Sequence, residues 1–310
     1  MATAYLFPGQ GSQSVGMGYQ LFEQSPAARA RFEAANELLD VDLLALMFGL
    51  DESIEDPAEK LKQTEITQPA LYTHSLAAMA VLEERGLAPD MAAGHSLGEY
   101  SALAAVGALS FEDGLRVVRR RGELMGEAGE RRPGSMAAVM GADDADVEAA
   151  CEAATAAGEG VVQPANYNAP GQIVISGDTE AVERATKEVS GRAIPLPVSG
   201  AFHSPLMEYA HDGLAEVLED VEIQPPRCPV YLNVTGAPTT DPDEIRKRLL
   251  EQLNAPVLWA QTLRNMHDNG ARRFVEVGAG DVLRGLVGRT LEGEVETMGA
   301  GTMEEIEALA

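Results

Sequence analysis

The sequence contains few lysines, cysteines and aromatic residues, and these scarcities exclude several classes of protein. Only 4 of its 23 basic residues are lysines, against 49 acidic residues, so the net charge is -26. Such a field repels nucleic-acid backbones and anionic lipids, and we expect neither as a partner. No run of 18 apolar residues occurs, and the N-terminus lacks a basic flank before an apolar stretch. We therefore expect no membrane span and no export signal.

The two cysteines, Cys151 and Cys228, stand far apart and form neither a metal knuckle nor a redox pair. This pattern predicts reduced thiols, a cytoplasmic location and no metal. The acid-rich, lysine-poor composition also suggests a cytoplasm whose salt screens self-repulsion.

Hydrophobic residues make up 45% of the 310 residues, which is typical of a globular protein with one large domain and room for a smaller inserted one. Helical and extended periodicities alternate, which predicts an α/β sheet with helices on both faces. The expected strands are 4–7, 91–94, 230–234 and 274–277, and the expected helices are 26–39, 67–85, 97–106, 112–128, 205–218, 242–252, 259–268 and 281–289.

A different order of elements occupies residues 134–199. The pattern there predicts strands at 136–140, 161–166, 172–176 and 193–198, with helices at 143–156 and 179–189. Strand, helix, strand, strand, helix, strand is a ferredoxin-like (βαββαβ) unit. We interpret it as a subdomain inserted between residues 1–133 and 200–310, which form the core domain.

Gly94-x-Ser96-x-Gly98 places a serine between a predicted strand and a predicted helix. A sharp turn there exposes the hydroxyl as a nucleophile, although a tight turn without chemistry remains an alternative. A serine needs a base, and His203 follows a strand and precedes Ser204-Pro205, a typical helix start. The other four histidines fit less well, because His95 should point away and the rest lie within helices; these are His74, His211 and His267.

Two backbone N–H groups are candidates for stabilising an oxyanion: Leu97, directly after the serine, and Gln10 in the Gly9–Gln13 loop. That loop could also be a plain turn or a phosphate loop, although it lacks the Walker and dinucleotide spacings. Arg119, Arg120 and Arg121 cannot share one helix face, so at least one should point inward. A buried guanidinium needs a carboxylate, and the residues alone favour a structural partner over a substrate.

Six ordered motifs resemble the malonyl-CoA:acyl-carrier-protein transacylases of bacterial fatty-acid synthesis, over nearly the whole chain. They are Phe7-Pro8-Gly9-Gln10-Gly11-Ser12-Gln13, Gln68-Pro69-Ala70, Gly94-His95-Ser96-Leu97-Gly98-Glu99-Tyr100, Arg121-Gly122, Asn166-Tyr167-Asn168-Ala169-Pro170-Gly171-Gln172 and Gly200-Ala201-Phe202-His203-Ser204-Pro205. The resemblance implies a hydrolase-like α/β core with the inserted subdomain and a site between them.

By position, the resemblance makes Ser96 the acylated nucleophile, His203 its base and Arg121 the clamp for the malonyl carboxylate. It also implies that the Gln252 main-chain carbonyl orients the histidine. Gln10 and Leu97 would supply the oxyanion N–H groups, and a bulky Phe202 would disfavour methylmalonyl. Gln68, Met125 and Asn166 fall on pocket positions, although packing explains Met125 equally well.

The implied reaction is ping-pong and needs no cofactor of its own, because the phosphopantetheine is carried by acyl carrier protein. We expect a monomer that binds coenzyme A thioesters and docks the acidic carrier through local arginines. A serine thioesterase, an inert acyl-binding homologue and an acyltransferase serving a polyketide carrier are the alternatives. The candidate docking residues are Arg116, Arg119, Arg120, Arg131, Arg132, Arg284 and Arg289.

Overall fold

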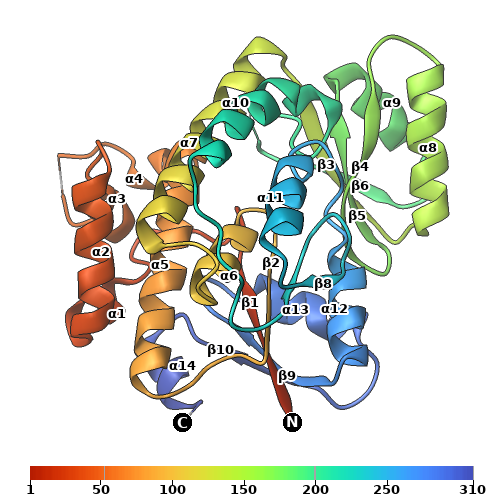
Figure 1. Ribbon diagram of the computed structural model, residues 1–310. Coiled ribbons are helices and arrows are strands. Elements are labelled where there is room, and N and C mark those ends of the chain that lie inside the picture. Colours follow the sequence, from red (N-terminus) through yellow and green to blue (C-terminus); the bar gives the residue numbers. More distant parts are fainter. Residues whose placement is uncertain (52, 199, 310) are drawn as a thin grey trace.

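A mostly parallel β-sheet forms the centre of the molecule in the computed structural model, which describes residues 1–51, 53–198 and 200–309 (Figure 1). The strand order is β10-β9-β1-β2-β7-β8, and only β7 and β8 are antiparallel neighbours. This confirms the predicted parallel sheet. The strands are β1 (Ala2–Phe7), β2 (Met91–Gly94), β7 (Val230–Tyr231), β8 (Pro238–Thr239), β9 (Ala271–Glu276) and β10 (Glu296–Gly299).

Helices cover both faces of this sheet because alternate residues of its strands are buried on opposite sides. Tyr5 and Phe7 of β1 belong to one apolar cluster, whereas Ala4 and Leu6 belong to another. The first cluster includes residues from α2 (Pro26–Leu38), α5 (Thr64–Glu84), α6 (Gly98–Ala105), α7 (Phe111–Arg131), α10 (Glu208–Glu219) and α11 (Pro242–Glu251). The second includes residues from α12 (Trp259–Asp268) and α13 (Val282–Thr290).

A second, antiparallel sheet lies beside the first, with the strand order β4-β5-β3-β6 (Figure 1). It has its own apolar cluster with two helices, and its element order matches the prediction. Its elements are β3 (Ser135–Met140), α8 (Asp144–Ala156), β4 (Val162–Ala169), β5 (Gln172–Gly177), α9 (Thr179–Glu188) and β6 (Arg192–Pro195). The Tyr167 N–H donates to the Val257 carbonyl at 2.9 Å, so β4 is joined directly to the core.

Several predicted boundaries are wrong. The strand expected over 230–234 ends at Tyr231, the strand expected over 193–198 ends at Pro195, and the helix expected from 205 begins as the 3-10 turn η1 (Pro205–Met207). The predicted boundary at 199 and the last residue, 310, lie outside the described residues. Short elements escaped prediction because they span too few residues for a period; these are α1 (Tyr19–Gln24), α3 (Leu43–Phe48), α4 (Pro57–Lys60) and α14 (Met303–Glu307), besides β8 and β10.

Candidate active site

Ser96 lies in a sharp turn between β2 and α6, with a left-handed φ of 51°. The flanking glycines are sterically required. A Cβ on Gly94 would lie 1.8 Å from the Gly98 carbonyl oxygen, and a Cβ on Gly98 would lie 2.0 Å from that of Phe7. The Asn233 side chain secures the turn, since it accepts from the Ser96 N–H at 2.7 Å and donates to the Gly94 carbonyl at 2.6 Å. The serine hydroxyl is thereby held at the carboxyl end of β2.

His203 lies next to that hydroxyl, with its Nε2 2.8 Å from Ser96 Oγ. Its Nδ1 is 2.7 Å from the main-chain carbonyl of Gln252. Because a carbonyl oxygen only accepts, Nδ1 carries the proton and Nε2 is free to accept from the serine. Burial, and secondly the charge of Arg121, lower the pKa of His203 to about 3. The imidazole is therefore a neutral base at physiological pH.

Arg121 enters the site from α7 with 1% of its surface exposed. One Nη donates to Gln68 Oε1 at 2.8 Å, and the other donates to Gln252 Oε1 at 2.8 Å and to Ser96 Oγ at 3.2 Å. Among the described residues no carboxylate pairs with it, so the structural carboxylate favoured from the residues alone is absent. Burial lowers the pKa of Arg121, yet a guanidinium stays protonated at neutral pH. A buried cation with only neutral partners therefore faces the serine.

Two backbone N–H groups border the same space. Those of Gln10 and Leu97 have no acceptor within the described part of the chain. The loop approaches the turn closely, because a Cβ on Gly9 would lie 2.4 Å from the His95 carbonyl oxygen. These N–H groups are available to an oxyanion formed beside Ser96.

A cavity of about 300 Å³ connects these groups, at the low end of small-molecule sites. One wall comes from the core and the other from the second sheet. The lining residues include Gln10, Ser96, Leu97, Arg121, Met125, Met136, Ala138, Asn166, Val174, Phe202 and His203. Of the predicted pocket residues, only Gln68 and Gln252 do not line it, since both lie behind Arg121 and bond to it.

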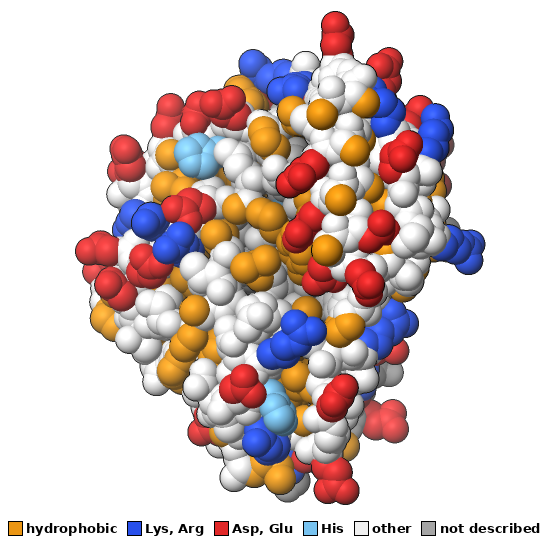
Figure 2. All heavy atoms as spheres, turned by 90° about the vertical axis from the view of Figure 1, so that its right-hand side faces the viewer, with side chains coloured by type: hydrophobic (Ala, Val, Ile, Leu, Met, Phe, Trp, Pro, Cys, Tyr) orange, Lys and Arg blue, Asp and Glu red, His pale blue; other side chains and the backbone are white. Residues whose placement is uncertain are grey.

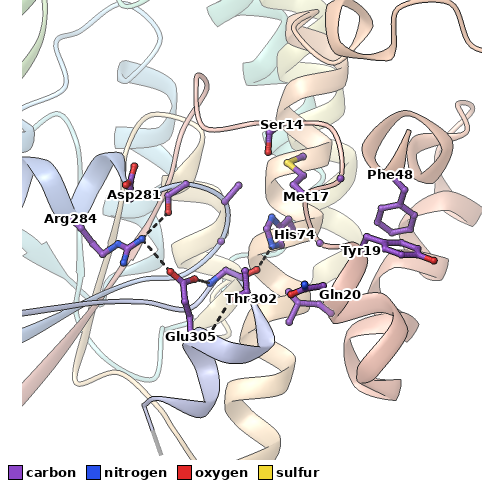
Figure 3. Close-up of a pocket in the computed structure, with 17 residues that line it drawn as sticks. Ser14, Met17, Tyr19, Gln20, Phe48, His74, Asp281, Arg284, Thr302 and Glu305 are labelled. Atoms are coloured by element: carbon purple, nitrogen blue, oxygen red, sulfur yellow. Dashed lines mark hydrogen bonds and ion pairs between the residues drawn. The ribbon is translucent and has the colours of Figure 1, made fainter. Parts of the chain in front are cut away.

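A larger cavity of about 620 Å³ lies where α1, α5, α13 and α14 approach one another (Figure 3). Its His74 bonds to the Gly301 carbonyl at 2.9 Å, and its Arg284 pairs with Glu305 at 3.2 Å. Neither Ser96 nor His203 lines it. Its histidine has no serine hydroxyl as a hydrogen-bond partner among the described residues, so the smaller cavity is the candidate active site.

Sequence reasoning missed four residues that support the site: Glu99, Gln163, Asn168 and Asn233. Asn168 Oδ1 is 2.7 Å from His95 Nε2, so this ring lines the cavity but is bonded to Asn168, whereas His203 is the histidine bonded to Ser96 Oγ. Gln163 donates to the His203 carbonyl at 2.9 Å. Glu99 and Asn168 lie within two of the six motifs, which was the available signal for them, whereas Asn233 follows β7 and fell inside the strand expected over 230–234.

The candidate docking arginines fall into two groups. Arg116, Arg119, Arg120, Arg132 and Arg284 each lie within 3.4 Å of a carboxylate. In contrast, Arg131 lies over the Tyr209 ring at 3.9 Å, and Arg289 donates to Gln172 Oε1 at 2.6 Å. Gln172 lines the cavity, so Arg289 lies at its edge.

Within the described ranges, no cluster of three His, Cys, Asp or Glu side chains could hold a metal ion. In the same ranges, no helix has both the length and the apolar character that a bilayer crossing requires.

Comparisons with known proteins point to one family. The sequence matches the acyl transferase domain family over residues 4–305. It is 44% identical to the malonyl CoA-acyl carrier protein transacylase of Bacillus subtilis, over 98% of this chain and 95% of that protein. The crystal structure of an acyl carrier protein S-malonyltransferase from Vibrio cholerae has a TM-score of 0.93 and 40% identity, covering both chains fully. A malonyl-transacylase in complex with a type II PKS acyl-carrier protein has a TM-score of 0.91 and 38% identity, over 99% of this chain and 98% of that one.

Proposed function

Because the chain belongs to the acyl transferase domain family, we propose that it moves malonyl from malonyl-CoA to the phosphopantetheine thiol of acyl carrier protein. The observation that carries this proposal is the buried Arg121 guanidinium, which has only neutral partners and lies 3.2 Å from the Ser96 hydroxyl. An acyl group that brings its own carboxylate would complete this site.

In the first half-reaction Ser96 Oγ attacks the thioester carbonyl while His203 Nε2 takes its proton. The N–H groups of Gln10 and Leu97 would stabilise the oxyanion. The carbon–sulfur bond then breaks, the proton passes from His203 to the coenzyme A sulfur, and malonyl remains as an ester on the serine. The Gln252 carbonyl, which accepts from Nδ1, holds the ring throughout and stabilises the transient imidazolium.

In the second half-reaction the carrier's thiol enters the same cavity and loses its proton to His203. Its sulfur attacks the ester carbonyl, and the serine recovers the proton as the ester bond breaks. Exchange between two thioesters is nearly isoenergetic, so the enzyme's main task is to keep water from the acyl-serine.

Arg121 supplies the selectivity, because a guanidinium binds a carboxylate through two parallel hydrogen bonds. Acetyl has no carboxylate and would displace solvent without pairing the buried charge, at a cost of several kcal/mol. Phe202 also lines the cavity, and its ring would crowd the α-methyl branch of methylmalonyl.

We further propose that residues 134–199 form a ferredoxin-like subdomain inserted into a hydrolase-like core of 1–133 and 200–310. The antiparallel order β4-β5-β3-β6 and the two helices packed on one face support this. On its other face Met136, Ala138 and Val174 line the cavity. The subdomain would thus form one wall of the substrate cleft.

The carrier must approach a chain of net charge -26, so docking needs a local basic surface. Arg289 is the best-placed candidate, because it lies at the cavity edge and pairs with no carboxylate among the described residues. Charge reversal at Arg289 should slow transfer to the carrier and leave acylation by malonyl-CoA unchanged. An unchanged rate of transfer to the carrier would show that Arg289 is not part of the docking surface.

We also propose that the protein is a monomer located in the cytoplasm. The free thiols of Cys151 and Cys228 are compatible with that location.

Mass spectrometry of intact protein after brief exposure to malonyl-CoA or acetyl-CoA tests the function. The wild type should form a malonyl adduct that is absent in Ser96→Ala. Arg121→Ala should slow malonyl loading about a hundredfold or more, because the carboxylate loses its buried partner, and should spare acetyl loading. Arg120→Ala is the matched control, since Arg120 is half-exposed on the same helix and bonds to Glu123 at 3.0 Å. Equal loading of Ser96→Ala and wild type would refute the nucleophile.

The thioesterase alternative predicts a different product. Malonyl-CoA supplied with carrier protein should give loaded carrier and little free malonate. Free malonate formed at the same rate with and without carrier would favour hydrolysis instead.

A further inference from the structure

Glu99 is a fully buried carboxyl three residues after the nucleophile, in the first turn of α6. The mechanism above does not use it. One of its oxygens accepts from the Asn233 backbone N–H at 3.0 Å, and the other accepts from the Gln252 side-chain amide. Both oxygens face donors, which is the hydrogen-bonding pattern of an ionised carboxylate.

The Gln252 amide has a single orientation that satisfies its neighbours. Its NH2 group donates to Glu99 and, at 3.0 Å, to the Ser96 carbonyl, while its Oε1 accepts from Arg121 at 2.8 Å. Rotation by 180° would place NH2 against a guanidinium that only donates and would place the oxygen against two acceptors. The Glu99 carboxylate and the Ser96 carbonyl therefore both hold the NH2 end away from Arg121, which leaves the Oε1 end facing the guanidinium.

The arrangement separates a buried cation from its nearest buried anion by one neutral side chain. A direct Glu99–Arg121 ion pair would occupy the two guanidinium N–H groups with which Arg121 could bind a substrate carboxylate. With the amide between them, Arg121 is partly neutralised and keeps its hydrogen-bonding capacity for a ligand.

We infer that Glu99 is a positioning residue for malonyl selectivity, which it exerts by fixing the Gln252 amide and thereby the Arg121 guanidinium. This rests on the proposed function, since it assumes that Arg121 receives the malonyl carboxylate. Burial raises the pKa of Glu99 to about 8, which favours the neutral acid, whereas its hydrogen bonds to Asn233 and Gln252 and the charge of Arg121 favour the carboxylate. Because a donor faces each oxygen, we assign the ionised form from this geometry.

The variant Glu99→Gln distinguishes two roles of Glu99, orienting the Gln252 amide and placing a negative charge near Arg121. The two roles predict opposite changes in the rate of malonyl loading. Removing a negative charge near Arg121 would by itself strengthen the attraction of the malonyl carboxylate. A glutamine, however, offers one acceptor oxygen to two donors, the Asn233 N–H and the Gln252 amide, so its own NH2 group would face one of them and the Gln252 amide would be held less firmly. We therefore expect slower malonyl loading, by roughly ten- to hundredfold, as for loss of a hydrogen bond to a charged group. Acetyl has no carboxylate for Arg121 to bind, so acetyl loading should change less than about threefold.

Glu276→Gln is the matched control. Glu276 is also fully buried, and it accepts from the N–H groups of Leu283 and Arg284 at the start of α13. It does not contact Gln252 or Arg121. Losing this carboxylate should lower the thermal midpoint and leave the ratio of malonyl to acetyl loading unchanged.

The experiment is a competition in which wild type, Glu99→Gln and Glu276→Gln each meet equal concentrations of malonyl-CoA and acetyl-CoA, with both adducts quantified by mass spectrometry. A lower malonyl-to-acetyl ratio in Glu99→Gln alone supports the inference. An unchanged or higher ratio overturns it, while the proposed function stands as long as the wild type forms the malonyl adduct. A wild type without that adduct refutes the proposed function itself.

Gln252→Met keeps the inference testable if Glu99→Gln does not fold, as measured by circular dichroism. Methionine preserves the main-chain carbonyl that bonds to His203 but interrupts the link from Glu99 to Arg121. We expect the same selective loss of malonyl loading. Equal loss with both substrates would overturn the inference.

Discussion

Ser96 and His203 share an uncommon backbone conformation. Within the described ranges only three non-glycine residues have positive φ, and two of them are this hydrogen-bonded pair. Left-handed φ angles cost L-residues roughly 1–2 kcal/mol each, and such strain is typical of active sites. Here it aims both side chains into one cavity.

That strain predicts a difference between two inactive variants. Ser96→Ala and Ser96→Gly both lose the hydroxyl, but glycine tolerates a φ of 51° without a Cβ penalty. Ser96→Gly should be more stable than Ser96→Ala by about 1 kcal/mol, as measured by urea unfolding. Equal unfolding midpoints would show that the turn is not strained.

The protonation state of His203 predicts the pH dependence of acylation. Its pKa falls from 6.5 to about 3, first because it is buried, so the base stays neutral and the loading rate should show no loss centred near pH 6.5, where an ordinary histidine would titrate. The unfolded chain takes up this proton below pH 6.5, so the stability that His203 contributes is complete above pH 6.5 and is lost as the pH falls toward 3. Rapid-quench loading rates across this range check the prediction, and a rate that halves near pH 6.5 would contradict it.

At the scale of elements, the pairing of α5 and α7 places Gln68 and Arg121 together. Pro69 lies inside α5 and lacks an N–H, so the Glu65 carbonyl loses its helical donor. Arg119 Nη1 of α7 donates to that carbonyl at 2.8 Å. The helices approach closely there, since a Cβ on Gly122 would lie 2.8 Å from the Thr64 carbonyl oxygen. Arg119 therefore completes the helix that carries Gln68.

A double-mutant cycle tests this role. Arg119→Ala should destabilise the protein by about 1–3 kcal/mol, because it leaves the Glu65 carbonyl without a partner. In a Pro69→Ala background the residue-69 N–H can supply that bond, so the cost of Arg119→Ala should be smaller. Equal costs in both backgrounds, measured by chemical unfolding, would exclude the coupling.

At the scale of the whole molecule, the large negative net charge conflicts with the docking of an acidic carrier protein at the cleft. Figure 2 shows acidic and basic side chains mixed around hydrophobic ones on one face, and the net charge is -26. Such an excess repels itself, whereas docking of an acidic partner depends on attraction to local basic side chains.

Salt should therefore act on stability and docking in opposite directions. The screening length falls from about 30 Å at 0.01 M to about 3 Å at 1 M salt. Raising KCl over that range should raise the unfolding midpoint and slow transfer to the carrier. A midpoint that does not change with KCl would remove the hypothesis of adaptation to a high-salt cytoplasm.

The amino-acid sequence was sufficient to predict the features that depend on local chemistry. Alternating periodicities predicted the α/β sheet, because side-chain burial on strands and helices repeats within each element. Gly94 and Gly98 marked the Ser96 turn, since only glycine fits there, and Ser204-Pro205 marked the start of the turn after His203.

The surroundings of Arg121, in contrast, follow from the packing of distant segments and could not be predicted from the sequence. Two glutamine amides replace the expected carboxylate, and Glu99 and Asn233 support them. These contacts join residues 53 to 153 positions apart. Hydrogen bonds between such distant segments leave no periodic trace in a sequence, because they depend on how the elements pack and not on the conformation of any one of them.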